Sequence, residues 1–303
     1  MDRRAFIRQT LQAALAVTAV GSVPILSLLP RPILAAAGST VAVRKGENIP
    51  LLVRQTLDAL GGMTQFVKKG ETVVVKPNIG WDRTPELAAN TNPLVVRTVV
   101  ELCLEAGAKQ VQVFDRPCND PRRCYVQSGI QEAVESIGSN RVKVEHMDRR
   151  GWQELDIAQG VELQRWEFYR PALEADRFIN LPIAKHHGLS TVTLGMKNIM
   201  GVIGGNRGRL HRQIDEALCD INLIVPSDLT LIDATRVLVA NGPQGGRAED
   251  VRRLDTLVAS ADIVAADSIA ATLLGHQPDD ISTLVTAGRR GLGIADLARI
   301  RRV

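Results

Sequence analysis

The sequence predicts an α/β protein: a mainly parallel sheet with helices on both faces, built as one elaborated domain with an insertion. Short β-branched runs alternate with amphipathic stretches of helical length, which is the pattern of stacked βαβ units. At 303 residues the chain is near the upper size of a single domain, and it has no internal repeat or low-complexity linker. Its hydrophobic fraction of 45% is ordinary for a soluble globular protein.

The expected elements follow from this alternation in chain order. Asn92 and Pro93 have the order of an N-cap and a first-turn proline, and Gly107 ends the same helix. Residues 148–174 show little periodicity, so we interpret them as an insertion within a single domain at 38–303. The expected strands are 41–44, 72–76, 110–115, 141–146, 177–181, 229–233 and 256–259, and the expected helices are 93–106, 124–136, 211–224 and 262–274.

Polar residues follow nearly every expected strand. The segments are KPNIGWDR, DRPCND, HMD, AKHHG, DATR and SAD, in chain order. In an open parallel sheet ligands bind at the carboxyl edge, where loops converge while the strands stay packed. We therefore expect these polar groups to gather at one edge, although loops are also polar for reasons of solvation alone.

The first 37 residues have the features of an export signal. A basic start is followed by a long, weakly hydrophobic run, and Ala35 and Ala37 supply an A-x-A cleavage pattern. Arg3 and Arg4, followed by Phe-Ile, resemble the twin-arginine signal, which the translocase reads as an address. We expect a periplasmic protein exported by the twin-arginine route, with the translocase as a partner and membrane contact only through the signal. An uncleaved anchor is the alternative, because the run approaches the length of a membrane span.

Composition argues against nucleic acid as a partner. The formal net charge is +4, but residues 1–37 carry a surplus of three positive charges, so the remainder carries about +1. The aromatic fraction of 3% leaves few side chains for stacking on bases. The basic character therefore belongs mainly to the signal.

The four cysteines do not form a recognisable cofactor motif. None are spaced C-x-x-C, and the closely spaced run that holds a ferredoxin-type cluster is missing. Cys103 and Cys219 fall in apolar helical patterns, so we expect them to be buried. Cys118 and Cys124 lie in a polar stretch, and a disulfide between them is one alternative outside the cytoplasm.

The segment LPIAKHHGLSTVTLGMKNIMG, residues 181–201, contains the main candidates for chemistry. We expect a strand to end at Leu181, a turn over 182–188 and a helix from about Ser190. Gly195 would then lie inside that helix at a cost of about 1 kcal/mol relative to alanine, which indicates a close approach of another segment.

In this segment Lys185, His186 and His187 would lie on the loop above the sheet. Lys197 would lie on the polar face of the helix with Thr193. Lysines near a helix N-terminus favour an anion, either a carboxylate or a phosphate, because unpaired amides and the helix dipole add to their charge.

A second polar group follows the apolar strand at 72–76. Lys76 precedes a proline, and Asn78 has an amide that could donate to an oxyanion or could close its own turn. Asp115 and Asp233 are candidates for orienting a lysine or a histidine, and Arg116 is a neighbouring candidate. Asp233 could equally cap the following segment.

Other catalytic motifs are weak or missing. The glycine-rich stretches GVIGGNRG and NGPQGG have neither dinucleotide-binding nor P-loop spacing, although they could cover a ligand as lids. No spacing matches a structural zinc site, and no serine has the surroundings of a nucleophile elbow. His211 and Asp215 are four residues apart on an expected helix, so a divalent ion bound by one histidine and carboxylates remains open.

Four stretches in this order resemble the family of the domain of unknown function 362. They are VVVKPNIG at 73–80, KHHGLSTVTLGMKNIMG at 185–201, LTLIDATRVLVANGPQGG at 229–246 and LVASADIVAADSIAATLLG at 257–275. The resemblance implies no settled reaction. It implies two branches, one fused to a ferredoxin-like module with two iron–sulfur clusters and one exported by the twin-arginine route. This sequence lacks the cysteine-rich module and is similar to the exported branch.

Our functional hypothesis is an exported protein that binds a small anionic molecule at the carboxyl edge of the sheet and acts on it by lysine and histidine acid–base chemistry. The alternatives are a redox or metal-linked accessory protein exported with a folded-in cofactor of unidentified type, and a non-catalytic binding module. The candidate catalytic residues are Lys185, His186, His187 and Lys197; the candidate ligand-binding residues are Lys76, Asn78, Asn198, Asp115 and Asp233, and no residue is assigned to a metal.

Overall fold

The computed structural model describes residues 38–303, so the predicted signal lies outside the described residues. The strands are β1 (Ser39–Lys45), β2 (Thr72–Pro77), β3 (Gln110–Val113), β4 (Val142–Val144), β5 (Trp152–Asp156), β6 (Arg165–Tyr169), β7 (Arg177–Leu181), β8 (Ile183–His187), β9 (Thr191–Thr193), β10 (Leu229–Leu238), β11 (Val251–Ser260) and β12 (Ile300–Arg302). The α-helices are α2 (Ile49–Asp58), α3 (Pro93–Glu105), α4 (Pro121–Gln127), α5 (Ile130–Glu135), α6 (Arg170–Glu174), α7 (Gly195–Asn198), α8 (Ile214–Ile224), α9 (Ile263–Leu273) and α10 (Ser282–Arg289). Two 3₁₀ helices near the site are η5 (Ile199–Val202) and η6 (Arg207–Gln213).

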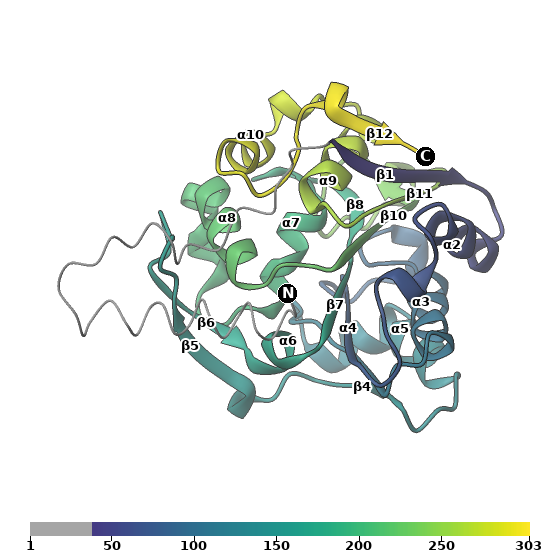
Figure 1. Ribbon diagram of the computed structural model, residues 1–303. Helices are drawn as coiled ribbons and strands as arrows, with labels where there is room; N and C mark the ends of the chain where they lie inside the picture. The colour runs from purple at the N-terminus through teal and green to yellow at the C-terminus, as the bar shows by residue number, and fades with distance from the viewer. Residues whose placement is uncertain (1–37) are drawn as a thin grey trace.

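A mostly parallel sheet forms the centre of the described chain (Figure 1). Its strand order is β12–β1–β11–β10–β7–β2–β3–β4, and β8 and β9 branch from β10. From β4 to β10 neighbouring strands are parallel, whereas β11 is antiparallel to both β10 and β1. The predicted α/β class with a mainly parallel sheet is confirmed.

Helices cover both faces of the sheet, because side chains alternate between two cores. In β2, Val73 and Val75 pack with the apolar sides of α2 and α3, while Val74 packs into the other core with α8, α9 and α10. Figure 1 shows α2, α3, α4 and α5 on one side of the strands and α7, α8, α9 and α10 on the other. Burial on both faces explains why the central strands are apolar throughout.

The expected helices are present, with local differences. Asn92 caps α3 by accepting from the Leu94 amide, and Pro93 occupies the first turn, as predicted. The expected helix at 124–136 is two helices, because Gly129 has a φ of 69° and interrupts the α-helical backbone between α4 and α5. The expected helix at 211–224 is regular only in α8, since its first turn belongs to η6.

Two features of the expected sheet are wrong. The strand expected at 229–233 continues to Leu238, so Asp233 lies within β10 rather than at its end. The segment after β11 was expected at the same edge as the other polar segments. Because β11 runs antiparallel to β10, Ser260 and Asp262 lie at the opposite edge.

The expected turn at 182–188 and helix from Ser190 are also wrong. Residues 183–187 form β8, which pairs with both β10 and β9, and the chain reverses through Thr191, whose φ is 62°. The β-branched run Thr191–Thr193 favours a strand, and only the four residues of α7 are helical. Lys185, His186 and His187 therefore lie on a strand and not on a loop.

Within residues 148–174 the chain forms the antiparallel pair β5–β6 and the short helix α6. Trp166, Phe168 and Tyr169 are buried in the core that also contains α8 and α9. Phe168 bridges to Ile203, so this segment abuts the part of the chain that follows α7. Across 38–303, no helix combines the length and the hydrophobicity needed to cross a membrane.

Candidate functional site

A buried ion pair forms the base of the candidate site. The Lys76 Nζ lies 2.8 Å from the Asp115 Oδ1, and both side chains are at most 3% exposed. The same ammonium donates to the Pro77 carbonyl at 2.8 Å and to the Asn198 Oδ1 at 2.9 Å. Burial lowers the pKa of Lys76, and the Asp115 carboxylate opposes that shift. Lys76 thus has three acceptors for its three N–H donors.

Backbone amides hold the carboxylate of this pair in place. Asp115 accepts from the amide nitrogen of Ile79 at 2.7 Å and from its neighbour Arg116 at 2.9 Å. Gly201 lies directly against the pair, because a Cβ at that position would be 1.8 Å from the Asp115 Oδ1 and 2.5 Å from the Lys76 Nζ. The pair therefore requires glycine at 201.

A chain of asparagine amides connects Lys76 to Lys185. The Asn198 Nδ2 donates to the Lys76 carbonyl at 3.2 Å and to the Asn180 Oδ1 at 2.8 Å. A backbone carbonyl only accepts, so this contact fixes the orientation of the Asn198 amide. Its Oδ1 then accepts from the Asn78 Nδ2 at 3.1 Å, which turns the Asn78 Oδ1 toward Lys185.

Lys185 is buried without a carboxylate partner. Its Nζ donates to the Asn78 Oδ1 at 3.2 Å and to the Ala89 carbonyl at 2.5 Å, and the side chain is 1% exposed. Among the described ion pairs none includes Lys185. The pKa of Lys185 is lowered to about 7, mainly by burial; the charges on Lys197 and Lys76 act in the same direction, and the Asp115 carboxylate acts in the opposite one. Its amine is therefore partly neutral near pH 7.

Lys197 pairs with a histidine from η6. The Lys197 Nζ lies 3.1 Å from the His211 Nε2 and 3.6 Å from the Met200 Sδ. The His211 Nδ1 lies 3.1 Å from the Gly208 carbonyl, which only accepts, so Nδ1 carries the proton and Nε2 accepts from Lys197. Burial lowers the pKa of Lys197 to about 8.

His187 stacks on His211, with ring centroids 5.5 Å apart and an interplanar angle of 16°. Burial lowers the pKa of His187 to about 3, and the nearby charge of Lys197 adds to this shift. Burial also lowers the pKa of His211. Both rings are therefore neutral at physiological pH.

Two arginines join the segments on either side of this site. Arg116 donates to the carbonyls of Ile203 and Gly205 at 2.9 and 3.1 Å. Arg207 donates in return to the carbonyls of Arg116 and Pro117 at 2.8 and 2.9 Å. Each guanidinium thus binds the backbone of the other arginine's segment.

Cys118 lies on one of the joined segments, exposed, with its Sγ 3.9 Å from the Arg207 Nη2. Cys118 and Cys124 are free thiols, so the disulfide alternative is not present in the structure.

The structure keeps two predicted residues away from the lysines. Asp233 accepts from the Asn92 amide at 2.7 Å and from the amide and hydroxyl of Thr235, so its carboxylate is used in holding the start of α3. The His186 Nδ1 accepts from the Gly242 amide at 3.1 Å and thereby holds the NGPQGG stretch. His186 and His187 point to opposite sides of β8, as expected for neighbours on a strand.

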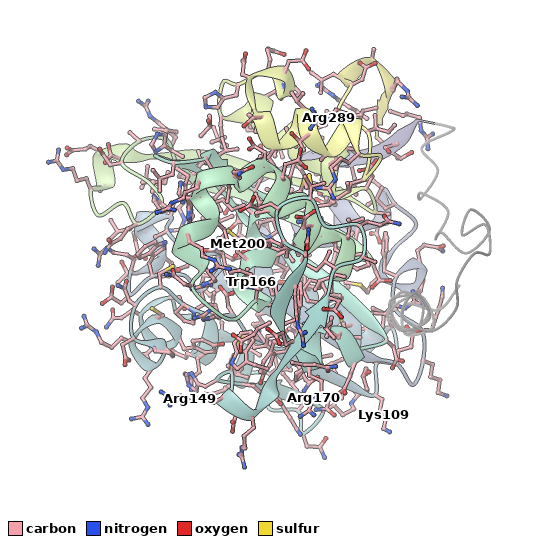
Figure 2. The ribbon with its side chains drawn as sticks, turned by 90° about the vertical axis from the view of Figure 1, so that its left-hand side faces the viewer. Lys109, Arg149, Trp166, Arg170, Met200 and Arg289 are labelled. Atoms are coloured by element: carbon pink, nitrogen blue, oxygen red, sulfur yellow. The ribbon has the colours of Figure 1, made fainter. Side chains whose placement is uncertain are left out.

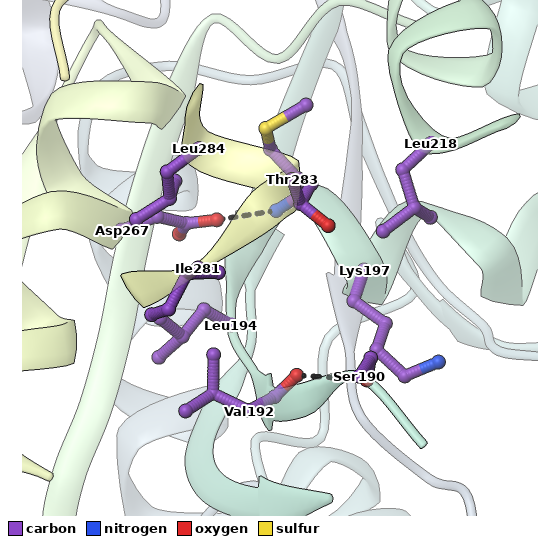
Figure 3. Close-up of a pocket in the computed structure, with 10 residues that line it drawn as sticks. Ser190, Val192, Leu194, Lys197, Leu218, Asp267, Ile281, Thr283 and Leu284 are labelled. Atoms are coloured by element: carbon purple, nitrogen blue, oxygen red, sulfur yellow. Dashed lines mark hydrogen bonds between the residues drawn. The ribbon is translucent and has the colours of Figure 1, made fainter. Parts of the chain in front are cut away.

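A small pocket beside α7 is lined in part by Lys197 (Figure 3). Asp267 accepts there from the amides of Gly195 and Met196 at 2.6 and 2.9 Å, and a Cβ on Gly195 would lie 2.6 Å from the Asp267 Oδ1. The close approach expected at Gly195 is therefore to Asp267. In Figure 3 the Lys197 ammonium points away from Asp267. The cavity of about 20 Å³ admits one water-sized molecule and not an organic anion.

The structure therefore joins five predicted residues by hydrogen bonds and one ion pair, and a sixth, Lys197, lies within electrostatic reach of Lys185. Sequence reasoning missed Asn180, Gly201, Thr193 as a buried hydroxyl, and the contact of His211 with Lys197. Residues 38–303 contain no group of three or more histidine, cysteine, aspartate or glutamate side chains arranged to hold a metal ion. We call the following residues the lysine cluster: Lys76, Asn78, Asp115, Lys185, Lys197 and Asn198.

The family model of the domain of unknown function DUF362 matches residues 73–272, which include every member of the lysine cluster. The chain belongs to the DUF362 family. A member from Synechocystis sp., a protein named as thylakoid-associated, is 29% identical over 248 residues, covering 79% of this chain and 74% of the relative.

Two solved structures show remote similarity to the chain described in this structure. A protein from Thermotoga maritima aligns with a TM-score of 0.45 and 14% identity, covering 77% of this chain and 61% of that one. The lactate racemase apoprotein from Thermoanaerobacterium thermosaccharolyticum aligns with a TM-score of 0.42 and 9% identity, covering 83% of this chain and 58% of that one. This chain thus spans about three fifths of each solved structure.

Proposed function

We propose that this protein binds a small organic anion at the lysine cluster and acts on it by proton transfer between lysine and histidine. The observation that supports this most directly is the imbalance of charge in the cluster. Lys185 lies within electrostatic reach of both Lys76 and Lys197, and of these three lysines only Lys76 forms an ion pair with Asp115. A buried ammonium without a counter-ion is unfavourable, so an anion at this point stabilises the protonated form of Lys197.

Proton uptake is the thermodynamic signature of this binding mode. The pKa values of Lys185 and Lys197 are lowered to about 7 and about 8, mainly by burial. An anion in contact with Lys197 raises the pKa of that lysine, so above pH 8 Lys197 must take up a proton on binding. Affinity therefore falls as pH rises above 8, by up to about tenfold per unit.

The pair formed by Lys197 and His211 supports acid–base chemistry. The Lys197 N–H donates to a neutral imidazole at 3.1 Å, a distance at which a proton can pass between them. A pKa of about 8 places Lys197 near the working pH of a general acid. His187, stacked behind His211, keeps that ring in position.

Isothermal titration calorimetry tests the site. Pyruvate and inorganic phosphate are titrated into the full chain in two buffers of different ionisation enthalpy at pH 7 and pH 9. We expect binding of at least one anion, net proton uptake at pH 9, and affinity reduced by about tenfold or more in Lys185→Met and in Lys197→Met.

The matched control is Lys109→Met, because Lys109 is exposed and in Figure 2 points outward at the lower edge, far from Met200 beside Lys197. The Lys109→Met variant should bind pyruvate and phosphate with the affinity of the unaltered protein. Thermal unfolding of each variant shows whether it is folded. Folded lysine variants that keep full affinity, or no binding of either anion at millimolar concentration, would contradict the proposed site.

We also propose that the protein is exported by the twin-arginine translocase to the periplasm. The support is the Arg3–Arg4 pattern and the apolar run that follows it. Replacing both arginines with lysine should leave the precursor in the cytoplasmic fraction, whereas Arg8→Lys should leave export unchanged. Equal export of the double variant would contradict this route.

A further inference from the structure

We propose that Lys185 is a nucleophilic amine that forms an imine with the carbonyl carbon of a 2-oxo acid. This inference rests on the proposed anion site, which would hold the carboxylate of the same molecule. It adds a covalent step and a substrate class to that site.

The hydrogen bonds of Lys185 match a neutral amine. Its Nζ has two acceptors, the Asn78 Oδ1 and the Ala89 carbonyl. An ammonium has three N–H donors, so one would lack an acceptor in this buried position. A neutral amine has two N–H donors and one lone pair. Both donors are then satisfied, and the lone pair remains available for attack.

Lys76 provides the contrasting case within the same cluster. Its Nζ has three acceptors, and one of them is the Asp115 carboxylate. That arrangement stabilises an ammonium with no lone pair to offer. Asn198 and Asn78, which together fix the orientation of the Asn78 Oδ1, therefore lie between a charged lysine, Lys76, and a nucleophilic one, Lys185.

Burial acts in the same direction and is the main cause that lowers the pKa of Lys185 to about 7. The positive charges of Lys197 and Lys76 add to this lowering, and the Asp115 carboxylate opposes it. A desolvated lysine beside another cation is a recognised means of keeping an amine nucleophilic at neutral pH. Lys197 has a pKa lowered to about 8, so it remains the more protonated of the two lysines and is suited to hold a carboxylate.

A buried hydroxyl beside Lys185 has no protein partner. The Thr193 Oγ1 makes no hydrogen bond, although Thr193 is only 4% exposed. Thr193 lies directly opposite Lys185 in the antiparallel pair of β8 and β9, so the two side chains project from the same face. An unsatisfied buried hydroxyl costs about 1–3 kcal/mol, which a ligand oxygen would recover. This position fits the carbonyl oxygen that becomes a hydroxyl during imine formation.

The chemical step balances with groups in the cluster. The Lys185 lone pair adds to the carbonyl carbon, and the oxygen becomes the hydroxyl of a carbinolamine. One proton from the Lys197 ammonium then leaves with that hydroxyl as water. The Lys185 nitrogen keeps one hydrogen in a protonated imine, and Lys197 becomes neutral. No oxidant or reductant takes part.

Reductive trapping tests the inference. The full chain is incubated with pyruvate and sodium cyanoborohydride, and the product is analysed by intact mass and peptide mapping. We expect one reduced pyruvate adduct per chain, located on Lys185, with exposed Lys109 unlabelled as the internal control. Trapping should be fastest between about pH 7 and pH 8, because Lys185 must be neutral and Lys197 protonated.

Two variants make the test specific. Thr193→Val keeps the shape of the side chain without its hydroxyl, and it should slow trapping about tenfold or more. Lys185→Met should abolish the adduct. Because that variant can fail to fold, the decisive result is the map of the unaltered protein. Calorimetric binding of pyruvate without an adduct on Lys185, or labelling of Lys109 to the same extent, would overturn the imine and leave the anion site standing. Lack of binding by both pyruvate and phosphate would instead remove the anion site.

Discussion

Replacing Lys76 with methionine should destabilise the protein strongly. Methionine retains most of the aliphatic length but removes the ammonium that faces Asp115 at 2.8 Å. Breaking a buried ion pair from one side costs about 3–5 kcal/mol, because the remaining charge is left without compensation. The backbone amides of Ile79 and Arg116 still bind the Asp115 carboxylate, so the middle of that range, about 4 kcal/mol, is the expected loss.

Urea unfolding followed by circular dichroism measures this loss, and thermal unfolding gives a second reading. For a chain of this size each 1 kcal/mol corresponds to about 2–4 °C, so the expected decrease in Tm is about 8–16 °C. Domains have a free energy of unfolding of about 5–15 kcal/mol in total, so the variant should remain folded at low temperature.

Two controls separate the ion pair from other effects. Lys109→Met removes an exposed lysine and should change the free energy of unfolding by less than about 0.5 kcal/mol. Adding Asp115→Asn to Lys76→Met removes the unpaired charge and should recover part of the loss. A Tm of the single variant within about 2 °C of the unaltered protein, or no recovery in the double variant, would refute the reasoning.

Three further predictions concern the same region. Gly201→Ala should lower the Tm and weaken pyruvate binding together, because its Cβ would overlap the Asp115 carboxylate; calorimetry that shows full affinity would argue against this. Asp233→Asn should cost about 1–3 kcal/mol in urea unfolding and leave pyruvate affinity unchanged, since its contacts are within the fold. The pKa of His187 is lowered to about 3 in the folded state, so below about pH 6.5 the unfolded chain binds a proton that the folded chain excludes, and stability decreases as pH falls from 6.5 toward 3. In thermal melts recorded between pH 6.5 and pH 3, His187→Gln should show a smaller decrease in Tm than the unaltered protein. An equal decrease in both would show that other groups cause the loss of stability.

Much of the sheet was predictable because its strands carry local signals. The run Val73–Val75, ended by Pro77 and polar residues, has the β-branched composition and the breaker that identify a buried strand. The start of α3 was equally readable, since Asn92 and Pro93 form a local cap. Such signals depend only on neighbours in sequence.

The hairpin of β8 and β9 was not predicted, because its stability comes from pairing with β10. The lysine and two histidines at 185–187 interrupt the apolar and β-branched composition that identifies a strand, and such polar side chains are typical of a loop. The β-branched residues Thr191–Thr193 after Gly188 were a signal for a hairpin. The contact between Lys197 and His211 had no local signal, because η6 approaches α7 only in the folded chain.

The crossed arginines have a consequence for how the family can diverge. Arg116 and Arg207 each end on carbonyl oxygens of the other's segment, so neither loop has its conformation fixed independently. If one arginine is lost, the other still donates hydrogen bonds to the first arginine's segment, but its own segment no longer receives any from that arginine. We therefore expect the two positions to be kept or lost together among relatives, and changes of loop length on one side to be accompanied by changes on the other.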